Sequence, residues 1–379
     1  MSELKVVPVN DRAGISAFIA AGRRAQSINP HWVEPVHEEI RMTFDRRRGP
    51  FLRENVIQPF VAFRGGEPVG RIVATIHAAH QKKFDDACGF FGFIDAIDDH
   101  AVFAALFAEA ERFLREGGMR LARGPFSLTI NHESGLLIDG FDHPHVVRTN
   151  HSPPHYAAHV EALGYRKARD LVAYACRVAV AEPRRVDRVV ERGPRLEFHR
   201  LSLLTWNRDF RRVLALYNDA WGDNDWATPV GDSEAKFIAR LMLPACKPRW
   251  IRIASYKGED IALAVHIPDA NEALKGLDGK LLPFGLARFL WRIHVRGTKT
   301  TRAPMTGVAR KWRNTKLGAL AVSALVAKTV EDARAAGVEE IEYSWMLESN
   351  TEAINGVRTL PARHTRTFRI YERSLYGEV

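Results

Sequence analysis

The sequence lacks the residues that mark several common classes of protein. It has three cysteines among 379 residues, Cys88, Cys176 and Cys246, which lie far apart and form no C-x-x-C pair. Neither a disulfide framework nor a cysteine-based zinc site is therefore predicted. No apolar run approaches the roughly 20 residues that cross a bilayer. Because the N-terminus also lacks the basic and apolar blocks of a signal peptide, we expect a cytoplasmic protein.

Missing motifs disfavour three further classes. The pattern G-x-x-x-x-G-K-[ST] is absent, which argues against a P-loop enzyme. No nucleic-acid reader motif is present and the basic residues are dispersed, so we expect no nucleic-acid partner. His77 and His80 have the spacing of two ligands on a helix, but we identify no third ligand nearby. We therefore expect no metal.

Positive charge is what the sequence has in excess. Lys and Arg number 55 against 45 Asp and Glu, which gives a formal net charge of +10. Such a charge indicates an anionic partner, and nucleic acid, an acidic membrane and a phosphate-bearing cofactor all have the right sign. High genomic GC content also enriches Ala and Arg, so the charge by itself does not choose among them.

One order of elements occurs twice, in the two halves of the chain. Each half is predicted to contain a strand and amphipathic helix, a β-hairpin with a Gly-Glu turn, a strand and long helix, a further strand, and then a short helix and a basic strand. The matching segments are 5–19 and 199–217, 60–76 and 251–267, 90–118 and 301–337, 119–128 and 338–347, and 163–178 and 360–375. The long helices are predicted to end at Gly117 and Gly337.

A proline- and charge-rich stretch around 180–195 separates the two copies. We therefore expect two domains, 1–182 and 196–379. Each is expected to be a mixed α+β domain with a mostly antiparallel central sheet flanked by helices.

The segment "RKWRNTKLGALA", Arg310 to Ala321, places dense positive charge before an apolar helical run. A helix N-terminus offers unpaired N–H groups and the positive end of a dipole, both of which suit phosphate. Helices usually place acidic residues in the first turn, so cations there indicate a phosphate cradle. A solvated basic loop is the alternative. The first copy has Asp95, Asp98, Asp99 and His100 at this place, which would cap a helix but repel a pyrophosphate.

The element order resembles the GNAT acyltransferase fold, present twice. In that family a loop of pattern [RQ]-x-x-G-x-[GA] opens the long helix, and its amides hold the pyrophosphate of acyl-CoA. Arg313, Lys316 and Gly318 occupy the three marked positions, with Lys316 in place of the first glycine. The resemblance implies one acyl-CoA site in the second copy, formed by Gly307, Val308, Arg310, Arg313, Asn314, Thr315, Lys316 and Gly318. A strand amide near Gly307 and Val308 is expected to stabilise the thioester oxygen.

A more specific resemblance is to a group of bacterial tandem-GNAT proteins. The blocks "GRIVATI", "GFFGF", "RGPFSLTINHESGLLIDGFD", "GYRKARDLVAY" and "SWMLESN" carry it. Bacterial ceramide synthases, which acylate the amine of a long-chain sphingoid base, look similar to this group. The resemblance implies an acyl-CoA-dependent N-acyltransferase whose acceptor is a primary amine. A long-chain sphingoid base, which would give a ceramide, is one such acceptor. An acetyltransferase for a small amine or a protein and a non-catalytic GNAT-like scaffold stay open.

Several residues are candidates for proton transfer. Glu348, at the end of the strand before Asn350, is expected to be a partly buried base, with a capping role as the alternative. His132 and Glu133 lie at the corresponding strand end of the first copy and are a second candidate set, with a surface pair as the alternative. The usual GNAT general acid is a tyrosine seven residues after the helix asparagine, where this chain has Val357. Tyr371 is a candidate to replace this general acid, and the alternative is that it is an ordinary tyrosine of a strand.

The segment "PFGLARFLWRIHVRG", 283–297, is the best candidate for membrane contact. As a helix it places Leu286, Phe289, Leu290 and Ile293 on one face and Arg288, Arg292 and Arg296 on another. A basic amphipathic helix lies on an anionic bilayer, which would make the protein peripheral to the inner membrane. It is equally a core helix with solvated arginines, and the basic segment 41–54 has the same two interpretations.

Overall fold

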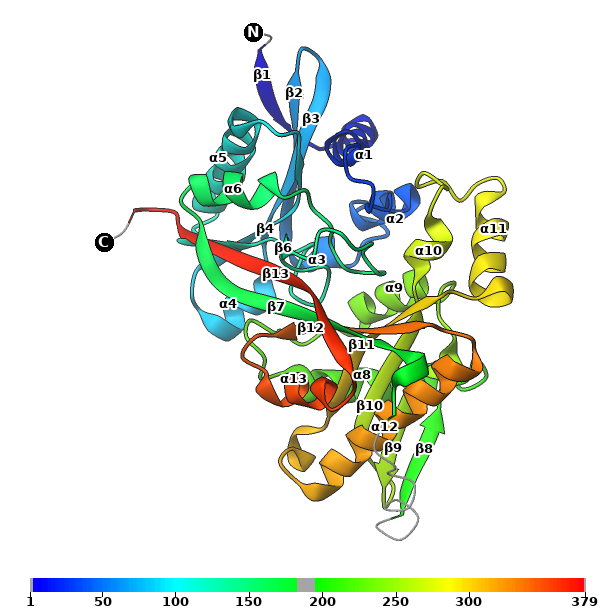
Figure 1. The fold of residues 1–379 in the computed structure, drawn as a ribbon. Helices are drawn as coiled ribbons and strands as arrows, with labels where there is room; N and C mark the ends of the chain where they lie inside the picture. The colour runs from blue at the N-terminus through cyan, green and yellow to red at the C-terminus, as the bar shows by residue number, and fades with distance from the viewer. Residues whose placement is uncertain (1–2, 183–194, 378–379) are drawn as a thin grey trace. The chain divides into compact units, whose positions relative to one another are not determined.

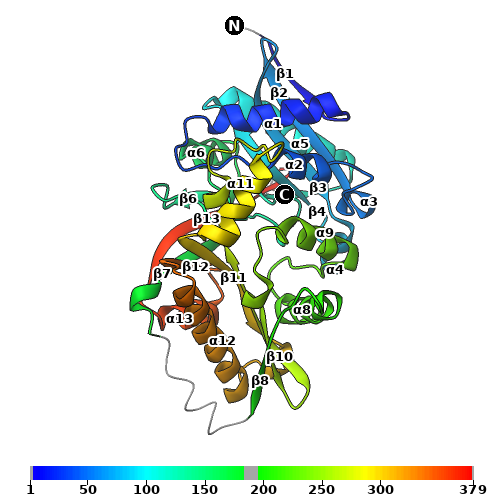
Figure 2. The same ribbon diagram turned by 90° about the vertical axis from the view of Figure 1, so that its right-hand side faces the viewer.

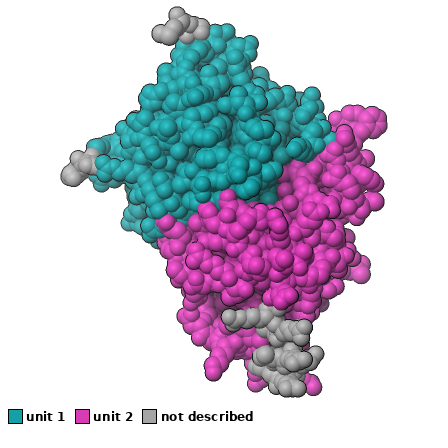
Figure 3. Space-filling view, in the orientation of Figure 1, with its two compact units in different colours: residues 1–171, 275–280, 366–379 teal, residues 172–274, 281–365 magenta. Residues whose placement is uncertain are grey.

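The computed structural model describes residues 3–182 and 195–377 and divides the chain into two compact units (Figure 3). Unit 1 comprises Met1–Leu171, Lys275–Lys280 and Arg366–Val379, and unit 2 comprises Val172–Leu274 and Leu281–Thr365. Most of the predicted boundary stretch, 180–195, lies outside the described residues. The predicted division into 1–182 and 196–379 differs from this one, because each unit contains segments from both sides of that boundary.

Unit 1 is built on a sheet with strand order β1-β2-β3-β4-β5-β13 (Figure 1). The strands β4 and β5 are parallel, the other neighbours are antiparallel, and β6 also pairs with β13. The strands are β1 (Leu4–Pro8), β2 (Val56–Arg64), β3 (Glu67–Ile76), β4 (Cys88–Ala96), β5 (Leu121–Gly124), β6 (Leu136–Asp139), the start of β7 (Arg166–Arg177) and the end of β13 (Ala362–Ser374). The helices are α1 (Arg12–Gln26), α2 (His37–Thr43), α3 (Phe51–Glu54), α4 (Ala78–Phe84), α5 (His100–Glu116) and α6 (His155–Ala162).

Helices α1 and α5 cover opposite faces of the unit 1 sheet. Successive side chains of a strand point to opposite faces. In β3, Val73 belongs to the same apolar cluster as Phe18 of α1. Its neighbour Ile72 belongs instead to the cluster of Phe103 and Leu106 of α5. The sheet is therefore buried on both sides, which explains why its strands are apolar almost throughout.

Unit 2 repeats this arrangement with strand order β8-β9-β10-β11-β12. Here β11 and β12 are parallel and the other neighbours are antiparallel. The strands are β8 (Leu196–Arg200), β9 (Arg252–Tyr256), β10 (Glu259–Pro268), β11 (Thr300–Val308), β12 (Glu340–Leu347), the end of β7 and the start of β13. The helices are α8 (Trp206–Trp221), α9 (Asp232–Met242), α10 (Ala270–Leu274), α11 (Gly285–Trp291), α12 (Lys316–Ala335) and α13 (Thr351–Arg358). Short 3₁₀ helices are η1 (Val178–Val180), η2 (Pro248–Trp250) and η4 (Arg310–Trp312), and η3 (Arg292–Arg296) is a π-helix. The repeated element order predicted from the sequence is confirmed.

The last strands of the two halves are divided between the units. The end of β13 pairs with β5 in unit 1, where Tyr371 lies opposite Gly124. Conversely, β7 passes into unit 2 at Val172, and just beyond it the N–H of Val178 donates to the carbonyl of Glu339 at 2.9 Å. Both segments are basic strands of similar pattern, so the sequence does not show which sheet each strand joins.

Candidate active site

The strands β11 and β12 of unit 2 separate along their length. Strand β11 pairs with β10 from Thr301 to Val308, but its pairing with β12 covers Thr300 to Arg302. The N–H of Ala309 donates to the carbonyl of Ile261 at 2.8 Å, on the β10 side. Because N–H groups alternate in direction along a strand, the N–H of Val308 points to the other edge, beyond the last pair with β12. Of the two amides expected to stabilise the thioester oxygen, the geometry therefore favours that of Val308.

The end of α8 covers this strand. A Cβ placed on Gly307 would lie 2.6 Å from the ring of Trp221, so the indole contacts the strand where a side chain would otherwise be. Trp221 stacks on Tyr217, with ring centroids 5.2 Å apart. Sequence reasoning missed both aromatic residues. Their spacing of four residues at the end of a predicted helix was the available signal.

The start of α12 keeps part of its hydrogen-bonding capacity. The hydroxyl of Thr315 accepts from the N–H of Gly318 at 3.0 Å, and its carbonyl accepts from the N–H of Ala319. Among the described residues, no acceptor lies within hydrogen-bond distance of the N–H groups of Lys316 and Leu317. Two amides at the positive end of the helix dipole are thus available to an anion.

Gly318 is required by a close approach of the backbone. A Cβ at this position would lie 2.2 Å from the carbonyl oxygen of Trp312, which no real contact allows. The preceding Asn314 has φ 59°, in the left-handed region that asparagine tolerates better than most residues. The loop therefore folds tightly against the first turn of α12.

Most of the cations in this loop are already paired. Arg310 and Arg313 bind the carboxylate of Asp223 at 2.8 and 3.0 Å. The N–H of Arg310 also donates to Asp219 at 2.6 Å, and Lys311 binds Glu259 at 2.7 Å. The sequence led us to expect four cations awaiting an anion. This expectation is wrong for three of them, because Asp219 of α8, Asp223 just after α8 and Glu259 at the start of β10 bind them. They were not considered because they lie 52 to 91 residues away.

Lys316 differs from the other three cations. Its side chain is exposed, and within 3–182 and 195–377 no carboxylate lies within 4 Å of its ammonium group. It stands on the first turn of α12, beside the two available amides. Lys316 and the helix start therefore supply most of the capacity of the loop to bind an anion. Arg310 and Arg313 supply less, because Asp223 neutralises them.

The equivalent helix start in unit 1 is occupied by carboxylates. Asp99 accepts from the N–H of Ala101 at 2.9 Å and forms an ion pair with Arg64, whose hydrogen bond lowers the pKa of Asp99. Asp98 binds His159 at 2.7 Å. The capping role predicted for Asp99 is confirmed, and the negative charge there opposes binding of a second anion.

Glu348 and Asn350 follow the end of β12. Asn350 caps α13, with its side-chain oxygen accepting from the N–H of Ala353 at 3.1 Å. Glu348 is exposed, so the expectation that it is partly buried is wrong. The reason is that β12 ends at Leu347, and the following turn carries Glu348 into solvent.

His132, Glu133 and Tyr371 lie in unit 1, whereas the loop of Arg310 to Gly318 lies in unit 2. His132 is largely enclosed, its Nδ1 is 3.0 Å from the hydroxyl of Thr129, and burial followed by the nearby charge of Arg148 lowers its pKa to about 3. Glu133 forms an ion pair with Arg148 at 3.5 Å. This imidazole is therefore neutral at physiological pH.

Tyr371 is fully buried in the unit 1 core. Its hydroxyl donates to Glu161 at 2.8 Å. Burial and this hydrogen bond raise the pKa of the phenol, so it keeps its proton. These contacts are those of a structural tyrosine in a strand.

A cluster of potential metal ligands occurs in unit 1. Nitrogen, oxygen and sulfur atoms of His80, Asp86 and Cys88 lie within 4.8 Å of one another. Asp86 and Cys88 were not predicted as partners of His80, because they lie beyond the helix that carries the His77 and His80 pair. Asp86 already binds Arg123 at 3.4 Å, and burial raises the pKa of the Cys88 thiol to about 12. The guanidinium and the protonated thiol both oppose a bound dication.

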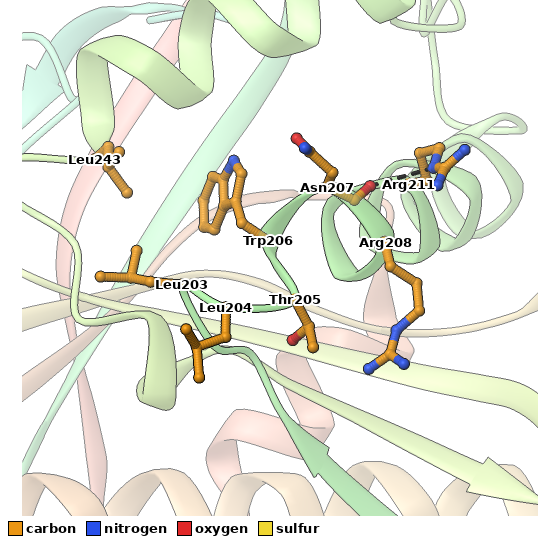
Figure 4. A pocket seen from close by; sticks show the side chains of 8 residues that line it. All are labelled: Leu203, Leu204, Thr205, Trp206, Asn207, Arg208, Arg211 and Leu243. Atoms are coloured by element: carbon orange, nitrogen blue, oxygen red, sulfur yellow. Dashed lines mark hydrogen bonds between the residues drawn. The ribbon is translucent and has the colours of Figure 1, made fainter.

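A hollow of about 610 Å³ opens at the start of α8 (Figure 4). Its walls combine exposed leucines with two arginines, and the lining residues are Leu203, Leu204, Thr205, Trp206, Asn207, Arg208, Arg211 and Leu243. Helix α8 has 16 residues, or roughly 24 Å at 1.5 Å per residue, and Asp219 is near its other end. The hollow is therefore separate from the basic loop.

Among the described helices, none combines the length and the apolar composition needed to cross a membrane.

Comparison with known proteins identifies the family. No protein-family model matches the chain. Over 377 residues it is 35% identical to a bacterial ceramide synthase of Caulobacter vibrioides, a match that covers 99% of this chain and 98% of that protein. The chain belongs to the bacterial ceramide synthase family. This member is also 32% identical over 366 residues to Protein YghO of Escherichia coli, covering 95% of this chain and 93% of that protein.

Solved structures establish the fold of this ceramide synthase family member. A tandem GNAT protein from the clavulanic acid biosynthesis pathway aligns over 100% of both chains with a TM-score of 0.58 and 14% identity. The expectation of two GNAT-like domains in tandem is confirmed. The chain is an acyltransferase that moves an acyl group to an amine.

Proposed function

We propose that this enzyme joins the acyl chain of a long-chain acyl-CoA to the primary amine of a sphingoid base, which forms a ceramide. Full-length similarity to a bacterial ceramide synthase supports this choice of acceptor. The observation that carries the proposal is the start of α12, where two backbone amides and Lys316 remain available beside the separated strands β11 and β12. This is the charge and geometry that a diphosphate needs.

In the proposed reaction the N–H groups of Lys316 and Leu317 and the ammonium of Lys316 bind the diphosphate. The thioester lies along the free edge of β11, where the N–H of Val308 donates to the carbonyl oxygen and stabilises the negative charge of the tetrahedral intermediate. The amine nitrogen forms the new bond to the carbonyl carbon, and the carbon–sulfur bond breaks. Positioning of the two substrates supplies much of the rate.

Proton transfer is assigned to Glu348, which we keep as the proposed base. Its exposed position at the end of β12 suits transfer through a water molecule, and Asn350 orients the adjacent start of α13. The thiolate of coenzyme A then takes its proton from solvent, because Val357 stands where the GNAT fold has a tyrosine acid. His132, Glu133 and Tyr371 are second candidates, and their contacts within unit 1 favour a structural role.

We further propose that the enzyme works in the cytoplasm and reaches its lipid acceptor at the inner membrane as a peripheral protein. The excess of positive charge supports contact with an anionic surface. An acetyltransferase for a small amine or a protein and a non-catalytic scaffold are the alternatives that the experiment below separates.

The test is calorimetry of acyl-CoA binding across acyl lengths, followed by product analysis with a sphingoid base. Tighter binding of long chains and ceramide product support the proposal. Preference for acetyl-CoA points to acetylation, and absence of binding points to a scaffold. Lys316→Gln should weaken coenzyme A binding by up to about fivefold through loss of one exposed charge. Lys311→Gln is the matched control, because Lys311 is engaged with Glu259, and equal losses would contradict the assigned site.

A further inference from the structure

The segment from Leu282 to Arg296 exposes an unusual amount of apolar surface. Of the twelve large hydrophobic residues that are exposed in the described chain, five lie here: Leu282, Phe284, Leu286, Trp291 and Val295. Phe284 is 81% and Leu282 80% exposed. Single exposed apolar residues are ordinary, but a contiguous group in one short segment marks an interaction surface.

The segment is anchored to unit 2 by its other side. Phe289 and Ile293 of α11 and η3 are buried, and the side chain of Arg292 donates to the carbonyl of Ala273 in α10 at 2.7 Å. Trp291 and Val295 are four residues apart, so they form a row on the opposite side of the helix. The sequence predicted one apolar face, whereas the structure has a buried row and a second, exposed one. Helix α11 is drawn in yellow in Figures 1 and 2.

Positive charge flanks the exposed row. Arg288 and Arg296 are exposed, and in the described part of the chain no carboxylate lies within 4 Å of either guanidinium. Burial, and then the nearby charges of Arg288 and Arg296, lower the pKa of Arg292. The last turn, Arg292–Arg296, is a π-helix, a form often found at functional sites.

We propose that this surface, Leu282 to Arg296, docks unit 2 on an anionic phospholipid bilayer. Leu282, Phe284 and Trp291 enter the boundary between head groups and acyl chains, while Arg288 and Arg296 bind lipid phosphates. A protein partner would be expected to supply carboxylates for the two arginines and a shaped recess for the apolar residues. An anionic bilayer supplies phosphates for the two arginines and an apolar layer for the exposed side chains, and it requires no matching shape. It is therefore the occupant that we choose.

This inference deepens the proposed function, since a lipid acceptor is delivered from a membrane, but its test does not depend on catalysis. Full-length protein is sedimented with vesicles of phosphatidylcholine alone and with vesicles that contain equal parts of phosphatidylcholine and phosphatidylglycerol. The wild type should bind the anionic vesicles, and binding should weaken with added salt. The double variant Arg288→Gln/Arg296→Gln should bind them on the order of thirtyfold more weakly.

The apolar part is tested with the double variant Phe284→Ser/Trp291→Ser, which should lose about tenfold or more in vesicle binding. Arg240→Gln and Ile28→Ser are controls, because both residues are exposed and lie outside the segment. All variants should keep the wild-type melting temperature and the wild-type rate with a water-soluble amine. Failure of acyl transfer in the wild type would overturn the proposed function and leave the binding result intact.

Three outcomes would overturn the docking surface. The first is absence of wild-type binding to anionic vesicles. The second is equal binding by the segment variants and the controls. The third is self-association in the absence of lipid that the Phe284→Ser/Trp291→Ser variant abolishes, which would assign the surface to a second copy of the chain.

Discussion

Asp223 and Arg313 form an ion pair of 3.0 Å between segments that are 90 residues apart in the sequence. Arg310 binds the same carboxylate at 2.8 Å, so one acidic side chain just beyond the end of α8 neutralises two cations of the basic loop. Arg313 also donates to the carbonyl of Ala220. The loop is thereby connected to α8 through both side chains and backbone.

We expect Asp223→Asn to strengthen binding of coenzyme A by about threefold to tenfold at low salt. The substitution releases two guanidinium groups, each able to attract phosphate, while the bonds to Ala220 and Asp219 keep the loop in place. Calorimetry at low and high salt measures the effect, which should fall with salt. Asp232→Asn on α9 is a control, since its ion pair is local to Lys236. Weaker binding by Asp223→Asn would mean that the carboxylate is needed to shape the loop.

Gly318→Ala should destabilise the start of α12 and weaken coenzyme A binding. The added Cβ would lie 2.2 Å from the carbonyl of Trp312, and displacing a backbone costs about 1–3 kcal/mol. Gly356→Ala in α13 is the matched control, because no atom lies within 4 Å of its added Cβ and alanine favours a helix. Denaturant unfolding and calorimetry should separate the two variants. A neutral Gly318→Ala would disprove the tight loop.

Buried neutral histidines should make unit 1 acid-sensitive. Burial lowers the pKa of His132 and of His145 to about 3, from 6.5 in the unfolded chain. As the pH falls, the imidazoles of the unfolded chain bind protons before those of the folded protein do. The neutral histidines therefore contribute their full stabilisation above about pH 6.5, and this contribution is lost as the pH falls toward their pKa in the folded protein. Between about pH 7 and about pH 5 the free energy of unfolding should fall by up to about 1.4 kcal/mol per pH unit for each histidine, as measured by denaturant unfolding at each pH.

The variant His132→Gln keeps a side chain able to bond Thr129 but removes the titrating group. It should flatten this pH dependence relative to the wild type. His143→Gln is the control for replacement of a histidine at the surface, because this side chain is exposed and lies 3.8 Å from Asp142. An unchanged slope in His132→Gln would show that this imidazole is not neutral in the folded protein.

Asp95→Ala should be strongly destabilising. Asp95 and Arg71 form a buried ion pair at 2.6 Å, and Asp95 also accepts from Gln26 at 2.7 Å. Removal of the carboxylate leaves a buried guanidinium without its counter-charge, which costs about 3–5 kcal/mol. Denaturant unfolding measures the loss, and the double variant Arg71→Met/Asp95→Leu should recover part of it. A loss below about 1 kcal/mol for Asp95→Ala would indicate that water reaches the pair.

The sequence by itself determined the repeated order of strands and helices, the Thr315 and Gly318 start of α12, and the carboxylate cap at Asp99. These features depend on local pattern, because helix periodicity, turn residues and caps act over a few neighbouring positions. The ion-pair partners, the exposure of side chains and the sheet that each strand joins depended on the tertiary structure. It paired Arg310 and Arg313 with Asp223, exposed Glu348, and placed β13 in the sheet of unit 1. Partners that lie 90 residues apart, and burial itself, depend on how the whole chain packs, and no local pattern specifies them.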